Sequence, residues 1–245
     1  MKYLFLHINQ KRYMYSFAEK VITFCCDLDF SGQLPAGISI MNPFRENGKV
    51  ITVISTFYRK YYSDNKPRRL ILGINPGRFG AGVTGIPFTD TVRLKEKCGL
   101  SIPGLKTHET SSVFIYEMIE RYGGCEKFYG DYFISSVSPL GFTKTGSNGK
   151  EVNFNYYDSR ELSDAILDFA VDSITKQLGF GIDREVCFCL GTGKNFRFLS
   201  KINAEHHFFK RIEPLEHPRF IMQYRLRQKE LYINSYIEKF SILTE

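Results

Sequence analysis

The chain has 245 residues, and 43% of them are hydrophobic, which is enough for the core of one sizeable α/β domain and excludes a disordered protein. Its apolar runs are too short to cross a bilayer, so we expect no membrane-spanning segment. The net charge of +7 favours a polyanionic partner.

Hydrophobic periodicity predicts the following elements in chain order. They are helices over residues 15–28 and 50–62, a strand over 70–74, a helix over 111–122, a strand over 132–137, a helix over 158–178, strands over 185–190 and 207–212, and a terminal helix that reaches Phe240. Helical segments separate the first three strands, and residues 194–202 lie between the third and the fourth. This alternation predicts a three-layer α/β/α fold around a mainly parallel four-stranded sheet. The chain contains no repeat or linker, so we expect a single domain over residues 1–245.

Ligands of parallel sheets bind where the strands end at their carboxyl edge. Function is therefore expected in the loops over residues 75–88, 138–155, 191–194 and 213–225. The first of these loops is rich in glycine and proline, and it holds one polar side chain, Asn75, directly after a strand. An asparagine cannot act as a base, but it can hold a water molecule by hydrogen bonds.

Other chemistries find little support in the same loops. The segment from Gly73 to Gly80 lacks the Gly-Lys-Ser/Thr ending of a phosphate-binding loop. Gly191-Thr192-Gly193 lacks the third glycine of a dinucleotide fingerprint. A pair of catalytic carboxylates is also not expected, because the first loop offers only Asp90 and the last only Glu213 and Glu216.

The six cysteines include no C-x-x-C pair, so we expect no zinc or iron–sulfur site. Unpaired, reduced cysteines are typical of a cytoplasmic protein. His206 and His207 would point to opposite faces of the last predicted strand, which argues against a metal pair. No metal and no organic cofactor are expected.

The first loop resembles the first motif of the single-strand-selective monofunctional uracil-DNA glycosylases (SMUG). The matching residues are Gly73-Ile74-Asn75-Pro76-Gly77, Phe79-Gly80 and Thr84-Gly85-Ile86-Pro87-Phe88. Three shorter matches follow in order, namely Ser138-Pro139-Leu140, Gly191-x-Gly193-Lys194 and His217-Pro218. The resemblance extends over residues 70–225, and the first motif is its most specific part.

This resemblance implies a division of labour among the candidate site residues. Asn75 would position the attacking water, Phe88 would stack on a flipped base, and His217 would stabilise the negative charge of the departing base. Further residues would line the base pocket: Gly73, Ile74, Pro76, Gly77, Phe79, Gly80, Ala81 and Ser136. No lysine falls where an amine nucleophile would be needed, which favours an enzyme without lyase activity.

The segment after His217 has two interpretations. It reads Arg219, Phe220, Ile221, Met222, Gln223, Tyr224 and Arg225, an apolar cluster flanked by arginines. By the resemblance it would act as a wedge that fills the vacated base stack, with Lys194 as a further DNA contact. Alternatively, its apolar residues are the buried start of the terminal helix.

Three positions depart from the family pattern. Ser136 stands where the family has a base-reading asparagine, Ala81 stands where it has a methionine, and Arg219 replaces the serine after the last Pro. A smaller base-reading side chain at Ser136 and a smaller side chain in the pocket wall at Ala81 imply a broader substrate range that includes xanthine or hypoxanthine. Asn153 or Asn155 is a candidate for the missing amide contact.

The sequence therefore predicts a monofunctional DNA glycosylase that acts as a monomer on uracil and other deaminated bases in DNA. A rival interpretation is a nucleic-acid-binding module that keeps the fold without the chemistry, since basic clusters suit both. A third is an enzyme that acts on free nucleosides or nucleotides.

Overall fold

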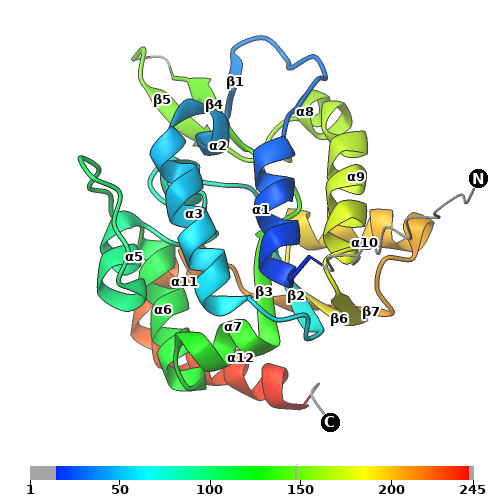
Figure 1. Cartoon of the computed structure of the whole chain (residues 1–245). Helices are drawn as coiled ribbons and strands as arrows, with labels where there is room; N and C mark the ends of the chain where they lie inside the picture. Colours follow the sequence, from blue (N-terminus) through cyan, green and yellow to red (C-terminus); the bar gives the residue numbers. More distant parts are fainter. Residues whose placement is uncertain (1–14, 147, 243–245) are drawn as a thin grey trace, which may run out of the picture.

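A four-stranded parallel sheet forms the centre of the molecule (Figure 1). The structure is a computed structural model, and it describes residues 15–146 and 148–242. The strands lie in the order β3-β2-β6-β7, and every neighbouring pair is parallel. Their bounds are β2 Arg68–Gly73, β3 Tyr132–Ser136, β6 Ile182–Leu190 and β7 Arg211–Leu215. The prediction of a parallel four-stranded sheet is confirmed.

Helices cover both faces of this sheet, as two neighbouring residues of β3 show. The ring of Phe133 packs against Phe17 of α1 (Phe17–Asp27) and Tyr58 of α3 (Gly48–Tyr61), at centroid distances of 5.3 and 6.3 Å. Tyr132 points to the opposite face and lies 4.7 Å from Phe240 of α12 (Lys229–Ile242). Because successive strand residues face opposite sides, these contacts define three layers. The predicted α/β/α architecture is confirmed (Figure 1).

The remaining helices connect the strands or flank the sheet. They are α2 Pro43–Glu46, α4 Ala81–Thr84, α5 Thr91–Cys98, α6 Thr110–Tyr122, α7 Cys125–Asp131, α8 Arg160–Ala165, α9 Leu167–Leu178, α10 Lys194–His206, α11 Pro218–Tyr224 and the 3₁₀ turn η1 Leu226–Gln228. The helix predicted over residues 158–178 is therefore interrupted at Ile166, whose φ of −97° and ψ of 1° depart from helical values. The predicted terminal helix begins only at Lys229, because η1 separates it from α11.

The strand predicted over residues 207–212 is wrong in its first half. His207 ends α10 in a left-handed conformation with φ of 52°, and β7 begins only at Arg211. The side chain of Asn203 accepts from the N–H of Phe209 at 2.8 Å and donates to its carbonyl at 3.0 Å. These bonds satisfy the backbone N–H and carbonyl of Phe209, which a strand would otherwise pair with its neighbour. The apolar residues Phe208 and Phe209 can therefore be buried outside the sheet.

A second, antiparallel sheet was not predicted. It has the order β1-β4-β5, with β1 Ile38–Met41, β4 Gly141–Thr145 and β5 Glu151–Phe154. Its strands are short and partly exposed, so they lack the apolar runs that reveal the central strands. This sheet touches the first motif, because a β-carbon at Gly141 would lie 2.5 Å from the carbonyl oxygen of Pro76.

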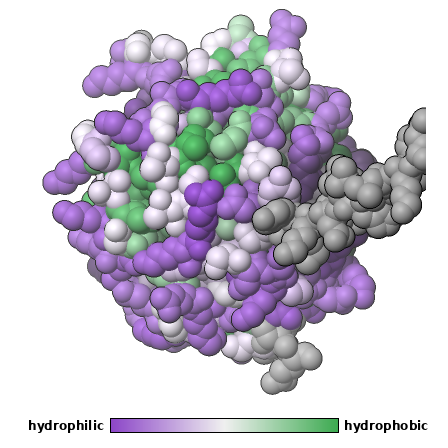
Figure 2. Space-filling model, viewed as in Figure 1, coloured by the Kyte–Doolittle hydropathy of each residue, from purple (hydrophilic) through white to green (hydrophobic). Residues whose placement is uncertain are grey.

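Polar residues cover most of the face seen in Figure 2, with smaller apolar areas between them. Among the helices in the described parts of the chain, none is long and apolar enough to cross a membrane. Large apolar side chains that are exposed include Phe79, Phe220 and Tyr224, all close to the strand-end loops. Three exposed aromatic residues therefore lie where the sequence predicted function, whereas a fourth, Tyr15, lies elsewhere.

Candidate active site

A cavity of about 710 Å³ opens at the carboxyl ends of the parallel strands. This volume lies within the range of roughly 300–1,000 Å³ typical of small-molecule sites. All four predicted loops contribute to its walls, together with residues at the start of α6. The predicted site residues that line it are Ile74, Asn75, Pro76, Gly77, Ala81, Phe88, Ser136, Lys194, His217, Arg219, Phe220, Gln223 and Tyr224. The structure therefore brings most of the predicted residues to one place.

Three of the predicted base-pocket residues, all from the first motif, do not line this cavity. Phe79 is 46% exposed, and the Arg78 guanidinium lies over its ring at 4.4 Å, so its side chain faces solvent. Gly73 and Gly80 lie behind neighbouring side chains. A β-carbon at Gly73 would lie 2.9 Å from the ring of Phe88, and one at Gly80 would lie 2.2 Å from a carboxyl oxygen of Glu109. The two glycines thus make room for residues that do reach the cavity.

Asn75 lies just after β2, and its amide is held at both ends. The backbone N–H of Tyr156 donates to Asn75 Oδ1 at 3.1 Å. The Nδ2 amine donates to the carbonyls of Pro76 and Phe154, each at 3.3 Å. Because a backbone N–H can only donate, the oxygen of the amide must face Tyr156. One lone pair of Oδ1 remains, which can accept a hydrogen bond from a water molecule in the cavity.

Phe88 presents its ring to the cavity from a strained backbone. Its φ is 51°, in the left-handed region that residues other than glycine rarely adopt. The ring lies against Gly73 and 5.7 Å from the imidazole of His217, at an interplanar angle of 49°. Strain of this kind persists where surrounding structure enforces it, and it gathers at functional sites. The arrangement leaves an aromatic surface beside the imidazole.

His217 stands at the N-terminus of α11 with a defined tautomer. The backbone N–H of Arg219 donates to His217 Nδ1 at 3.1 Å, so the proton of the neutral ring is on Nε2. Burial lowers the pKa of the imidazole to about 4, and the positive charge of Arg219 adds to this effect. At neutral pH the side chain is therefore uncharged and offers Nε2–H as a donor.

The third loop places a helix N-terminus at the rim of the cavity. Gly191, Thr192 and Gly193 line the cavity directly before α10, and Gly193 caps the helix without a side-chain hydrogen bond. The first N–H groups of a helix favour an anion, and Lys194 adds a positive charge at the same point. The Lys194 ammonium also lies 5.7 Å from the ring centre of Tyr157. This rim is suited to a phosphate group.

The segment after His217 fits neither of its two predicted interpretations completely, because some of its apolar side chains are exposed and others are buried. It forms the short helix α11, in which Phe220 and Tyr224 are 36% and 62% exposed. Their rings lie 5.7 Å apart, and the Arg225 guanidinium lies 5.5 Å from the Phe220 ring. Ile221, however, is fully buried. The prediction that Ile221 contacts DNA is wrong in this structure, because the helical period turns it inward, and Met222 is partly buried against the core.

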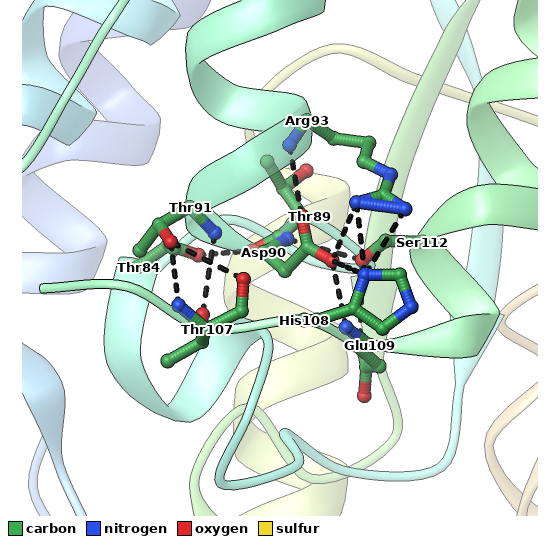
Figure 3. A network of polar contacts seen from close by, with 9 residues as sticks. All are labelled: Thr84, Thr89, Asp90, Thr91, Arg93, Thr107, His108, Glu109 and Ser112. Carbon is green, nitrogen blue, oxygen red and sulfur yellow. Dashed lines mark hydrogen bonds and ion pairs between the residues drawn. The ribbon is translucent and has the colours of Figure 1, made fainter.

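Sequence reasoning missed Glu109, which lines the cavity from the N-terminus of α6. Figure 3 shows the network that holds it, with the fully buried Asp90 at its centre. Asp90 accepts from the N–H of Glu109 at 2.7 Å and from the N–H of Arg93 at 2.8 Å. Its own N–H donates to Ser112 Oγ at 3.0 Å. Asp90 does not line the cavity itself, but it fixes the backbone of Glu109, whose carboxyl group does.

The two small residues of the predicted pocket lie where expected. Ser136 ends β3 and Ala81 begins α4, and both line the cavity. Asn153 and Asn155 also reach it, and Asn153 Oδ1 accepts from the N–H of Arg78 at 3.0 Å. The amides proposed to replace the missing asparagine are thus both present in the wall.

Within residues 15–146 and 148–242, no group of three or more histidine, cysteine or acidic side chains is arranged to hold a metal ion. The six cysteines are all free. His206 does not lie on a strand as predicted but ends α10, with its ring stacked 5.2 Å from that of Phe208.

Comparisons with known proteins agree with this fold. Residues 59–241 match the profile of the uracil DNA glycosylase superfamily. The fold is similar to the crystal structure of wild-type SMUG2 from Pedobacter heparinus, with a TM-score of 0.92 and 56% sequence identity over 94% of this chain and 99% of that one. A search of curated proteins finds no match. The chain belongs to the uracil DNA glycosylase superfamily, as a SMUG-like DNA glycosylase of the uracil-DNA glycosylase type.

Proposed function

We propose that this enzyme extrudes a deaminated base from DNA into the cavity and releases it by hydrolysis without a covalent enzyme intermediate. The observation that carries the proposal is the meeting of Asn75, Phe88 and His217 at one cavity, although they come from two loops far apart in the sequence. A base in a duplex is inaccessible to such a cavity, so extrusion is required. Phe88 then replaces part of the lost stacking.

The bond between C1′ of the deoxyribose and the base nitrogen breaks first, and its electron pair leaves with the base. For uracil the leaving group is an anion, and His217 Nε2–H is the donor that stabilises this charge where it develops. Since the imidazole is neutral, it stabilises the departing base through a hydrogen bond rather than through a positive charge. The water held by Asn75 Oδ1 then adds to the cationic C1′ and loses a proton to solvent.

DNA would be held on both sides of the cavity mouth. The N-terminus of α10 with Lys194 is suited to one backbone phosphate, and Arg219 and Arg225 are suited to others. The exposed rings of Phe220 and Tyr224 would fill the gap that the extruded base leaves. Arg225 is not part of the cavity wall, so we assign it to the DNA surface around the mouth.

A wide substrate range follows from the two small wall residues. Ser136 and Ala81 leave space that a larger asparagine and methionine would occupy, and this favours entry of the larger rings of xanthine and hypoxanthine. We further propose that the chain acts as a single-domain monomer in the cytoplasm, whose reducing conditions suit its free cysteines. Light scattering during size-exclusion chromatography tests the monomer.

The test is a panel of oligonucleotides, single- and double-stranded, carrying uracil, hydroxymethyluracil, xanthine or hypoxanthine. Base release is scored as alkali-labile abasic sites under single-turnover conditions, for the wild type and for the Asn75→Ala and His217→Ala variants. Release of uracil that both variants reduce supports the proposal. If neither variant changes base release, the assignment of the site is wrong. If no oligonucleotide loses a base but free nucleosides do, the DNA substrate is wrong.

A further inference from the structure

Glu109 is a carboxyl group that the hydrolytic scheme does not use, although it lines the cavity. Its backbone is fixed by the bond from its N–H to Asp90 Oδ2, at 2.7 Å. The hydroxyl of Ser112 donates to Glu109 Oε2 at 3.3 Å. Asp90 is in turn fully buried and bound to Arg93, so the position of Glu109 is built into the core. A glutamate held in this way is not a mobile surface side chain.

The carboxyl of Glu109 lies directly on the backbone of the first motif. A β-carbon at Gly77 would lie 3.0 Å from Oε1, and one at Gly80 would lie 2.2 Å from Oε2. Any larger residue at position 80 would displace the carboxyl group. Ala81 follows at once and lines the same wall. The space left by this small side chain is therefore next to a polar group that can reach a bound base.

The surroundings of Glu109 keep its proton available. Burial, helped by the negative charge of Asp90 and opposed by Ser112 and Arg219, raises the pKa of the carboxyl to about 7. The charged groups that face it are thus Asp90 from the loop before α5 and Arg219 from α11. Near neutral pH the protonated and ionised forms coexist.

A protonated carboxyl offers the same pattern of hydrogen bonds as a side-chain amide, with one acceptor oxygen and one donor. Uracil, xanthine and hypoxanthine share a lactam edge, in which a ring N–H lies beside a carbonyl group. Cytosine and adenine instead present a ring nitrogen acceptor beside an amino group. A group with one acceptor and one donor therefore favours these deaminated bases over cytosine and adenine, whereas guanine and thymine share the lactam edge and are not rejected by it.

Other residues in the wall are less suited to this role. Ser136 has one hydroxyl and cannot form both bonds to a lactam edge in the plane of the base. The oxygen of Asn153 already accepts from the backbone N–H of Arg78 at 3.0 Å.

Of the other amides in the wall, Asn195 is already bonded, because its Oδ1 accepts from the Tyr156 hydroxyl at 2.6 Å and its Nδ2 donates to the carbonyl of Leu190 at 3.0 Å. Gln223 lies on α11, the helix assigned to the DNA surface, so Asn155 enters the test below as the competing reader.

We propose that Glu109 reads the lactam edge of the extruded base and is the specificity-determining residue of the pocket. This inference rests on the proposed function of the same cavity. The acceptor oxygen of Glu109 binds the ring N–H, and its hydroxyl donates to the adjacent carbonyl oxygen. The proposal explains how a pocket with a serine at position 136 still discriminates against cytosine and adenine.

The test compares Glu109→Gln, which keeps an acceptor and a donor, with Glu109→Ala, which removes both. The control is Glu120→Gln, because Glu120 lies on the same helix, is exposed and pairs with Lys97 on the surface. Single-turnover rates are measured for uracil, xanthine and hypoxanthine between pH 5.5 and 8.5. Melting temperatures and affinity for DNA with an abasic analogue show whether each variant is folded and binds.

We expect Glu109→Ala to lower the release rate about 10- to 100-fold, as the loss of one strong hydrogen-bonded group predicts, with DNA affinity unchanged. Glu109→Gln should keep the wild-type rate within about threefold and should not lose activity as pH rises through 7, whereas the wild type should. Glu120→Gln should match the wild type in both respects.

Three results would overturn the proposal. If Glu109→Gln is as slow as Glu109→Ala on every base, the carboxylate is a proton acceptor rather than a reader. If Glu109→Ala is unaffected while Asn155→Ala loses activity, Asn155 is the reader. If the release rate of every Glu109 variant depends on pH as the wild-type rate does, the Glu109 carboxyl does not form hydrogen bonds with the base. A wild-type enzyme that releases no base would instead refute the proposed function itself.

Discussion

Replacement of Asn75 by aspartate tests the orientation of its amide. In the wild type, Nδ2 donates to the carbonyls of Pro76 and Phe154, each at 3.3 Å, while Oδ1 accepts from the N–H of Tyr156 at 3.1 Å. Aspartate keeps the bond to Tyr156, because one carboxylate oxygen replaces Oδ1. Its second oxygen, however, faces two carbonyl oxygens that have no proton to donate.

The size of the effect follows from these two lost bonds. Each buried acceptor that loses its hydrogen-bond donor costs about 1–3 kcal/mol of stability, and the half-buried position of Asn75 favours the lower end for each of the two carbonyls. We therefore expect a loss of about 2–3 kcal/mol in the free energy of unfolding. For a chain of this size that corresponds to a decrease of about 5–10 °C in melting temperature. Protonation of the new carboxyl relieves one contact, so the decrease should be smaller at pH 4 than at pH 8.

Thermal unfolding followed by circular dichroism measures this directly, with Asn75→Ala as the matched variant. Alanine also removes the water-holding oxygen, so it should lower base release about 10²- to 10³-fold, whereas aspartate keeps that oxygen and should remain the faster of the two. An aspartate variant that melts with the wild type at pH 8 would refute the assigned orientation of the amide. So would a decrease in melting temperature that does not change between pH 4 and pH 8.

Three further outcomes are expected. Since the pKa of His217 is lowered to about 4, it stays neutral above pH 5, and release of uracil by the Glu109→Gln variant should be constant between pH 6 and 8; a tenfold fall toward pH 6 would contradict this. Lys194→Ala should weaken DNA binding and reduce the slope of log affinity against log salt by about one, in fluorescence anisotropy titrations. Gly80→Ala should displace the Glu109 carboxyl and lower base release about 10- to 100-fold, with DNA affinity unchanged; a wild-type rate would show that the loop adjusts.

The central sheet could be predicted because its strands are buried on both faces. In β2, Leu70, Ile71 and Leu72 are each at most 1% exposed, so consecutive apolar residues mark the strand without alternation. The apolar residues Phe208 and Phe209 also stand next to each other in the sequence, but they do not belong to a strand, because β7 begins only at Arg211. There Asn203 satisfies the backbone of Phe209 from within α10, and a bond of this kind has no signature in local hydrophobicity.

The meeting of the motifs at one edge of the sheet could be predicted from the sequence, but the environment of each side chain could not. Asn75 is visible as a fixed polar residue after a strand, whereas two of the groups that orient its amide belong to Phe154, which ends β5, and to Tyr156, two residues further along the chain. The antiparallel sheet that carries them has no strong pattern of its own. The tautomer of His217 likewise depends on a backbone N–H whose direction only the helical turn of α11 defines.

Glu109 shows why a search of strand-end loops was too narrow. The carboxyl arrives from the N-terminus of a helix that precedes β3, and it reaches the cavity only because Asp90 binds its backbone. In the sequence, Asp90 stands out only as the single acid of the first loop, and its bond to the backbone of Glu109 could not be predicted. A wide pocket made by Ala81 and Ser136 would admit bases without distinguishing them, so a polar reader is needed somewhere in its wall. The buried network around Asp90 holds Glu109 in a fixed position, and if Glu109 is the reader that we propose, a wide pocket can still select among bases.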